Sequence, residues 1–106
     1  TILITEDDDE VRCFLERELS PHFKTRTAAN GKDALRVLEE EEISLVVSDV
    51  MMPEMNGFEL CRMIKSQLPF SHIPVILLTA LTDERQRIFG ITGGADDYIQ
   101  KPFHRL

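Results

Sequence analysis

The chain has 106 residues, of which 42% are hydrophobic and 29% charged, and its formal net charge is -7. This size and composition predict one domain, residues 1–106, with a single hydrophobic core. The acidic balance argues against sequence-independent binding of this segment to nucleic acid or to an anionic membrane. No stretch is long enough to span a bilayer and no signal peptide precedes the first predicted strand, so we expect a cytoplasmic domain, whose parent could still be membrane-anchored.

Apolar runs that favour strands alternate along the chain with patterns of helical period. Strands are predicted at Thr1–Thr5, Lys24–Ala28, Ile43–Asp49, Pro74–Leu78 and Tyr98–Gln100. Helices are predicted from Val11 to Leu19, from Ala34 to Leu38, from Phe58 to Leu68 and from Thr82 to Phe89. In the third helix the expected buried stripe is Phe58, Cys61, Ile64 and Leu68. Both cysteines, Cys13 and Cys61, fall in predicted helices and are expected to be reduced, structural thiols.

Strands that alternate with helices predict a doubly wound α/β fold, with one five-stranded parallel sheet and right-handed crossovers. The expected strand order is 2-1-3-4-5, the flavodoxin-like order, which puts the first and third strands at the switch point. Such a sheet needs helices on both faces. The four predicted helices are one fewer than five such strands require. We therefore expect the fifth helix to be missing or truncated at Leu106.

Polar residues stand at the carboxyl ends of the predicted strands, where ligands bind in an open α/β sheet. Glu6 and Asp7 follow the first strand, and Asp49 ends the third. Thr79 follows the fourth, and Lys101 follows the fifth. Three acids, a hydroxyl and an ammonium would meet in one crevice. Such a set suits a divalent metal and a phosphoryl group.

The acidic run after the first strand has two interpretations. Asp8, Asp9 and Glu10 are best explained as charge that favours the amino end of a helix. Glu6 and Asp7 stand next to the strand, and carboxylates held together there repel one another unless a cation such as Mg²⁺ lies between them.

Asp49 has a competing interpretation as the N-cap of the next helix. Pro53 and Gly57 place that helix several residues later, which argues against a capping role. A carboxylate can act as a nucleophile toward phosphorus and form an acyl phosphate. The charge of the phosphoryl oxygens must then be offset by a metal and a lysine, while a hydroxyl donates a hydrogen bond. Thr79 and Lys101 supply the last two groups.

The chain resembles the receiver domain of bacterial two-component response regulators, the CheY-like family, over essentially its whole length. The matching segments are Ile2–Asp7, Ser48–Pro53, Asn56-Gly57, Leu78–Ala80 and Ala95–Phe103. The spacing between these segments makes the resemblance far more specific than any single motif. The expected fold therefore follows from the resemblance as well as from the pattern of elements.

The resemblance implies a phosphoacceptor site. Asp49 would take a phosphoryl group from the phosphohistidine of a histidine kinase. Glu6, Asp7, Asp49 and the backbone carbonyl of Met51 would hold Mg²⁺. Lys101 would pair with the phosphoryl oxygens. Such a domain catalyses only its own phosphorylation and dephosphorylation, so it is not an enzyme acting on a free substrate.

The resemblance also implies a switch. Thr79 would turn toward the phosphate and Tyr98 would move inward, which changes the surface around the fourth helix and fifth strand. The alternative for Tyr98 is a half-buried aromatic residue with a hydrated hydroxyl. The peptide bond between Lys101 and Pro102 is expected to be cis.

The implied partner is a histidine kinase or a phosphotransfer domain. Ser48–Pro53 and Tyr98–Phe103 are similar to receivers inside hybrid sensor histidine kinases, whose parent chain would be a phosphotransferase. A free-standing regulator with an attached DNA-binding domain is the alternative. The resemblance leaves open whether the activated domain forms a homodimer.

Three other functions compete with a phosphoacceptor. An unphosphorylated pseudo-receiver is disfavoured because all five expected site groups are present. A phosphatase with an aspartate nucleophile would want a second acid two residues later, where Met51 stands. A flavin carrier would need a loop that cradles phosphate after the first strand, and the acids of residues 6–9 would repel one.

Overall fold

The computed structural model describes residues 1–79 and 96–100. In chain order its elements are β1 (Ile2–Thr5), α1 (Asp9–Leu19), β2 (Thr25–Ala28), α2 (Gly31–Glu40), β3 (Leu45–Asp49), α3 (Gly57–Ser66), β4 (Val75–Thr79) and β5 (Asp97–Gln100). The strands form one parallel sheet in the order β2-β1-β3-β4-β5. The predicted doubly wound fold and strand order are thus confirmed. The predicted helix at Thr82–Phe89 lies outside the described residues, as does any fifth helix.

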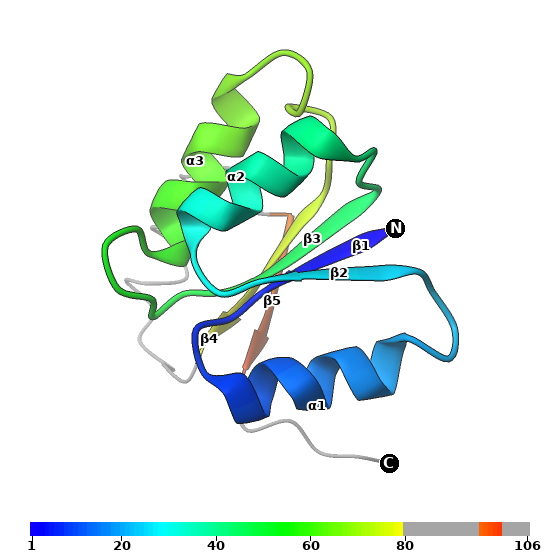
Figure 1. Ribbon diagram of the computed structural model, residues 1–106. Coiled ribbons are helices and arrows are strands. Elements are labelled where there is room, and N and C mark those ends of the chain that lie inside the picture. Colours follow the sequence, from blue (N-terminus) through cyan, green and yellow to red (C-terminus); the bar gives the residue numbers. More distant parts are fainter. Residues whose placement is uncertain (80–95, 101–106) are drawn as a thin grey trace.

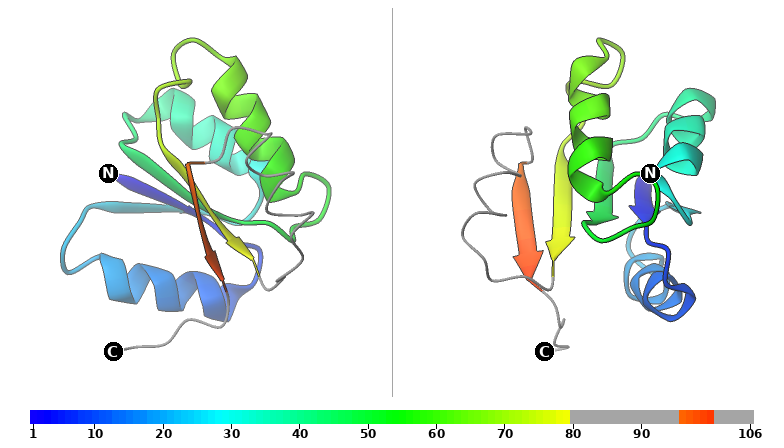
Figure 2. Two further views of the ribbon diagram at one scale, coloured as in Figure 1. Left: turned by 180° about the vertical axis from the view of Figure 1, so that it is seen from behind. Right: turned by 90° about the vertical axis from the view of Figure 1, so that its left-hand side faces the viewer.

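Helices cover the sheet on both faces, with α2 and α3 on one side and α1 on the other (Figures 1 and 2). Alternate strand residues point to opposite faces, so the core is divided into two clusters. Leu3, Val46, Val75 and Leu77 pack with α2 and α3. Ile2, Ile4, Val47 and Leu78 pack with Leu15 of α1. Strands β1, β3 and β4 are therefore buried on both sides, as their continuous apolar runs predict.

The face that carries α1 has an apolar hollow of about 540 Å³ beside that helix. Its walls include Leu19, Phe23, Leu45 and Ile76. Among the described helices, α1 alone lies on this side of the sheet (Figure 2). A doubly wound sheet buries both of its apolar faces. Among the described residues, this part of the apolar sheet face is therefore covered less completely than the face beneath α2 and α3.

Each described helix begins at a polar side chain that accepts backbone N–H groups of the first turn. Asp8 caps α1, Asn30 caps α2 and Asn56 caps α3. At α3 the carboxylate of Glu59 also accepts from the backbone of Asn56, which completes a capping box. The helix-terminal interpretation of Asp8, Asp9 and Glu10 is confirmed, because Asp8 is the N-cap of α1 and Asp9 and Glu10 lie in its first turn. Asp49 caps no described helix.

One predicted core residue is wrong. Leu68 was expected on the buried stripe of the third helix, but α3 ends at Ser66 and the Leu68 side chain is 89% exposed. Gln67 already has extended backbone angles, with φ -104° and ψ 122°. Pro69 disfavours helical geometry in the residue before it and lacks the N–H that would continue the helix. The helical spacing of apolar residues therefore continues to Leu68, although α3 ends at Ser66.

A lysine and an aspartate tie α3 to the beginnings of β4 and β5. The ammonium of Lys65 donates to the carbonyl of Ile73 and to Asp96 Oδ2, each over 2.8 Å. The same Asp96 oxygen accepts from the N–H of Val75 over 2.8 Å. Partial burial raises the pKa of Asp96, but the hydrogen bonds from Lys65 and Val75 and the Lys65 charge outweigh it, so the pKa lies below its ordinary value of 3.8. This contact therefore favours the ionised carboxylate.

We expect Asp96→Asn to lower the free energy of unfolding at neutral pH by less than about 1 kcal/mol, because the ion pair is half exposed. A carboxyl with a depressed pKa stabilises the fold fully above its unfolded pKa and loses that contribution as the pH falls through its folded pKa. The difference between wild type and variant should therefore be constant above about pH 5 and shrink below 3.8. Urea unfolding at several pH values measures it.

Glu39→Gln removes an exposed acid of α2 and is the matched control for the loss of one negative charge. Above about pH 5, the difference in unfolding free energy between Glu39→Gln and wild type should be smaller than that between Asp96→Asn and wild type. A difference for Asp96→Asn that grows as the pH falls would contradict the assignment.

The two cysteines have different surroundings. Both thiols are free, with Cys13 exposed and Cys61 buried. Burial raises the pKa of the Cys61 thiol, the Lys65 charge lowers it and the Asp96 charge raises it, with a net increase. A buried thiol with a raised pKa is a poor nucleophile, which agrees with the structural role predicted for Cys61.

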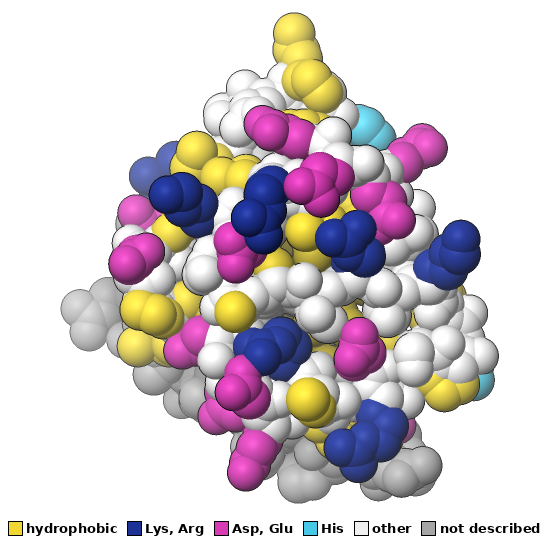
Figure 3. All heavy atoms as spheres, in the orientation of Figure 1, with side chains coloured by type: hydrophobic (Ala, Val, Ile, Leu, Met, Phe, Trp, Pro, Cys, Tyr) yellow, Lys and Arg dark blue, Asp and Glu magenta, His cyan; other side chains and the backbone are white. Residues whose placement is uncertain are grey.

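Charged side chains of both signs are mixed on the face shown in Figure 3. Part of the mixing comes from Arg26 of β2, which lies 3.5 Å from Glu41 and 3.9 Å from Glu40. Arg36 lies 3.4 Å from Asp33 on the same helix. These contacts offset part of the negative charge of the acidic run at the end of α2. None of the described helices has both the length and the apolar character required to cross a membrane.

Candidate functional site

Three carboxylates meet where β1 and β3 end. These strands are neighbours in the sheet, with Thr5 opposite Ser48, so the residues that follow them leave the sheet at the same edge. Glu6 and Asp7 come directly after β1, and Asp49 is the last residue of β3. One carboxylate oxygen from each of these acids lies within 4.8 Å of the other two. The structure thus brings together the three acids that the sequence singled out.

The three acids differ in their exposure to solvent. Glu6 and Asp49 are buried, with 1% and 4% of their surface exposed, whereas Asp7 is exposed. Buried carboxylates this close repel one another, which is costly unless a cation or donors offset their charge. Oxygens that bind one Mg²⁺ lie about 3 Å apart when adjacent and about 4 Å when opposite. The carboxylate spacing fits an Mg²⁺ ion bound partly through water, with Asp7 on the open side.

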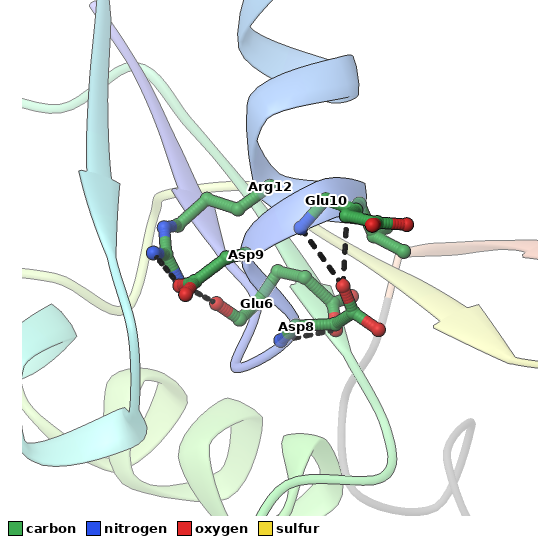
Figure 4. Close-up of polar contacts among 6 residues, drawn as sticks. Glu6, Asp8, Asp9, Glu10 and Arg12 are labelled. Carbon is green, nitrogen blue, oxygen red and sulfur yellow. Dashed lines mark hydrogen bonds and ion pairs between the residues drawn. The ribbon is translucent and has the colours of Figure 1, made fainter.

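Glu6 is held by three hydrogen bonds, of which those with Asp8 and Arg12 are drawn in Figure 4. Its backbone N–H donates to the carbonyl of Ala28 on β2 over 3.0 Å, which extends the β1–β2 ladder. Its side-chain Oε1 accepts from the N–H of Asp8 over 3.2 Å. Its backbone carbonyl accepts from Arg12 Nη1 of α1 over 2.8 Å. The chain thereby fixes both the main chain and the carboxylate of this acid.

Asp49 is held through its neighbours in the chain. The N–H of Val50 donates to Leu78 of β4 over 2.9 Å, and the hydroxyl of Ser48 donates to the carbonyl of Asp49 over 3.0 Å. The first residue of α3, Gly57, donates its N–H to the carbonyl of Val50 over 2.9 Å. Strand β3, strand β4 and helix α3 therefore all determine where the Asp49 carboxylate lies.

The other predicted site residues are placed only in part. Thr79 ends β4, one residue after the partner of Asp49 in the β3–β4 ladder, so its backbone reaches the same edge of the sheet. Tyr98 lies in β5 opposite Leu77. Met51 lies in the loop after β3 with 62% of its surface exposed. Lys101, Pro102 and the bond between them lie outside the described residues.

Sequence reasoning missed Arg12. The guanidinium of this residue bonds the carbonyl of Glu6, six positions earlier, and also contacts the carboxylate of Asp9. An arginine in the second turn of a helix normally suggests a solvated charge. The available signal was an arginine two residues after a run of acids that itself follows a buried strand.

Comparison with known proteins agrees with this arrangement. Residues 2–106 match the family model of the response regulator receiver domain. The chain is 46% identical over 104 residues to the transcriptional regulatory protein GltR of Pseudomonas aeruginosa, covering 97% of this chain and 43% of GltR. It is 45% identical over 104 residues to histidine kinase P4 of Formosa agariphila, covering 98% of this chain and 8% of the kinase. The chain thus spans less than half the length of these relatives.

A solved structure with the same fold is the receiver domain of a sensor histidine kinase from Pseudomonas aeruginosa PAO1, which holds a magnesium ion coordinated in its active site cleft. It superimposes with a TM-score of 0.87 and 29% sequence identity, over 97% of this chain and 85% of that domain.

Proposed function

Because this chain belongs to the response regulator receiver domain family, whose members are phosphoacceptors of two-component signalling, we propose that Asp49 accepts the phosphoryl group. Support comes from the position of Asp49 at the end of β3, where its carboxylate lies within 4.8 Å of those of Glu6 and Asp7. A carboxylate oxygen of Asp49 would attack phosphorus as the phosphorus–nitrogen bond of a phosphohistidine breaks. The electron pair of that bond returns to the imidazole.

The proposed metal ligands are the carboxylates of Glu6, Asp7 and Asp49 and the backbone carbonyl of Met51. Bound Mg²⁺ would supply positive charge to the phosphoryl oxygens and would relieve the repulsion among the acids. The carboxylate spacing supports this assignment, and a related receiver holds magnesium in its cleft. Among the acids, burial of Glu6 and exposure of Asp7 suggest that the ion enters from the side of Asp7.

Three further roles belong to the same proposal. Lys101 would pair with the phosphoryl oxygens, and Thr79 would donate a hydrogen bond to them. Tyr98 would move when Thr79 moves, so that the surface around β5 differs between the phosphorylated and unphosphorylated states. The two residues lie on adjacent strands, and Thr79 pairs with Gln100, two residues after Tyr98, which supports this coupling.

We further propose that residues 1–106 form one receiver domain of a longer cytoplasmic or membrane-anchored protein. The curated relatives support this, because the chain matches a fraction of a transcriptional regulator and of a histidine kinase. The direct partner would be a histidine kinase or a phosphotransfer domain. The domain would catalyse its own phosphorylation without turning over a free substrate, and a homodimer of the activated form is compatible with this role.

Incubation with acetyl phosphate and Mg²⁺ tests the assignment of Asp49. The intact mass of the wild type should increase by one phosphoryl group, and removal of Mg²⁺ with a chelator should prevent the increase. Asp49→Asn should gain nothing, because an amide cannot form the acyl phosphate. Glu16→Gln, which neutralises an exposed acid of α1 outside the cluster, should be labelled like the wild type.

A wild type that gains no phosphoryl group under these conditions would overturn the proposal in favour of an unphosphorylated interaction domain. Labelling of Asp49→Asn to the wild-type extent would show that another residue is the acceptor.

A further inference from the structure

Arg12 makes an unusual connection for a residue in the second turn of a surface helix. Its Nη1 donates to the backbone carbonyl of Glu6 over 2.8 Å, and its Nη2 contacts the carboxylate of Asp9 (Figure 4). The Arg12 side chain is 20% exposed, whereas that of Asp9 is 84% exposed. The guanidinium is therefore held between the turn that follows β1 and the first turn of α1.

The carbonyl that Arg12 binds belongs to the residue that carries the most buried acid of the site. Glu6 has left the sheet at this point, so its carbonyl is not part of the described β1 ladders. Removal of a hydrogen-bond donor from a buried carbonyl costs free energy. Arg12 supplies that donor from α1.

The same turn is fixed a second time by hydrogen bonds of Asp8. Its backbone N–H donates to the side chain of Glu6, its side chain accepts from the N–H groups of Glu10 and Val11, and its carbonyl accepts from the N–H of Arg12. Glu6, Asp8 and Arg12 thus form a closed set of contacts around the peptide units that carry Glu6 and Asp7. Loss of the contact from Arg12 would leave the peptide unit of Glu6 less tightly held.

From these contacts we infer that Arg12 is a positioning residue for the Mg²⁺ site, because it holds the turn of residues 6–8 in the conformation that presents the carboxylates of Glu6 and Asp7. This inference rests on the proposed function. A guanidinium suits the task because its planar fork can bind two acceptors at once, whereas a lysine ammonium is a compact point charge.

Whether replacement of Arg12 weakens or strengthens Mg²⁺ binding distinguishes a positioning role from a purely electrostatic one. If Arg12 acted only through its charge, removal of this cation would strengthen the binding of another cation nearby. A positioning role predicts the opposite result. Residues that orient metal ligands typically alter metal affinity by about 10-fold to 100-fold when they are replaced. We therefore expect Arg12→Met to raise the Mg²⁺ dissociation constant about tenfold.

The test is calorimetric titration of wild type, Arg12→Met and Arg12→Lys with MgCl₂, with metal-free melting curves to show that each variant is folded. Arg12→Lys retains the charge but not the fork, so it should also bind Mg²⁺ more weakly than the wild type. Arg17→Gln removes an exposed charge from the same helix and should bind as tightly as the wild type or more tightly. Should Arg12→Met fail to fold, Arg12→Lys carries the test.

Each outcome has one interpretation. Weaker binding by both Arg12 variants supports the inference. Unchanged or tighter binding by a folded Arg12→Met, or wild-type affinity of Arg12→Lys, overturns it. Absence of Mg²⁺ uptake by the wild type at millimolar concentration would instead overturn the proposed function, so the two failures can be distinguished.

Discussion

Replacement of Gly57 by alanine is expected to destabilise the domain by roughly 3 kcal/mol, the upper end of the usual cost of overpacking. A Cβ atom built on Gly57 lies 2.3 Å from the backbone carbonyl oxygen of Asp49 and 2.9 Å from Cα of Val50. Real Cβ atoms essentially never approach other atoms so closely. Because both obstacles are backbone atoms at the end of β3, no side-chain rotation relieves the clash.

The clash has a functional consequence. The N–H of Gly57 donates to Val50, so α3 and the end of β3 must separate or twist to admit the methyl group. Any such shift moves the peptide unit that carries Asp49. In Gly57→Ala that still folds, we therefore expect weaker Mg²⁺ binding together with the lower stability. Urea unfolding and calorimetric titration measure the two effects.

Gly31→Ala is a matched control at the first residue of α2. A Cβ on Gly31 lies 2.7 Å from Sδ of Met55, which is the far end of a flexible side chain. The end of the Met55 side chain can move, so the cost should be well below that of Gly57→Ala. Gly31→Ala/Met55→Ala removes the contact with Sδ but keeps the one with Met55 Cβ at 3.1 Å, so it should remove most of the steric cost. Equal losses of stability in Gly31→Ala and Gly57→Ala would contradict the argument from the backbone contact.

The parts of the fold that the sequence predicts are those governed by local pattern. Buried parallel strands are continuous apolar runs, so their positions can be recognised without tertiary information. The grouping of Glu6, Asp7 and Asp49 follows from strand order, because neighbouring parallel strands end at the same edge. The three acids could thus be expected to meet although Asp7 and Asp49 lie 42 positions apart in the sequence.

Features that depend on contacts between elements could not be predicted in the same way. The close approach of Gly57 to Asp49 requires the position of α3 relative to β3, which no local pattern encodes. The loop that joins them has a left-handed residue, Glu54 with φ 67°, although the sequence marks the turn by proline and glycine. Arg12 bonds a main-chain carbonyl, so its role depends on how α1 lies over the turn.

The carboxylate cluster makes the strongest prediction about metal. In the absence of Mg²⁺, Asp7→Asn should melt at a higher temperature than the wild type. Charges about 4 Å apart repel by about 1 kcal/mol in water and about 4 kcal/mol near a protein surface. Because Asp7 is exposed, relief of about 1 kcal/mol is expected, which raises the melting temperature of a domain of this size by about 4–8 °C.

The same variant should lose the stabilisation that Mg²⁺ gives to the wild type. A ligand that binds only the folded state stabilises it by about 1.4 kcal/mol at ten times its dissociation constant. Asp7→Asn has lost a charged ligand, so its melting temperature should be nearly the same with and without Mg²⁺. This melting temperature should be higher than that of metal-free wild type. It should be equal to or lower than that of Mg²⁺-saturated wild type.

Asp8→Asn separates the cluster from the general acidity of this part of the chain. Asn is as good an N-cap as Asp, so the variant keeps the start of α1 while it removes one charge from the same run. Because Asp8 is not a member of the cluster, Asp8→Asn should retain the Mg²⁺-dependent rise in melting temperature. If metal-free Asp7→Asn melts no higher than Asp8→Asn or wild type, the three carboxylates do not repel one another as their spacing requires.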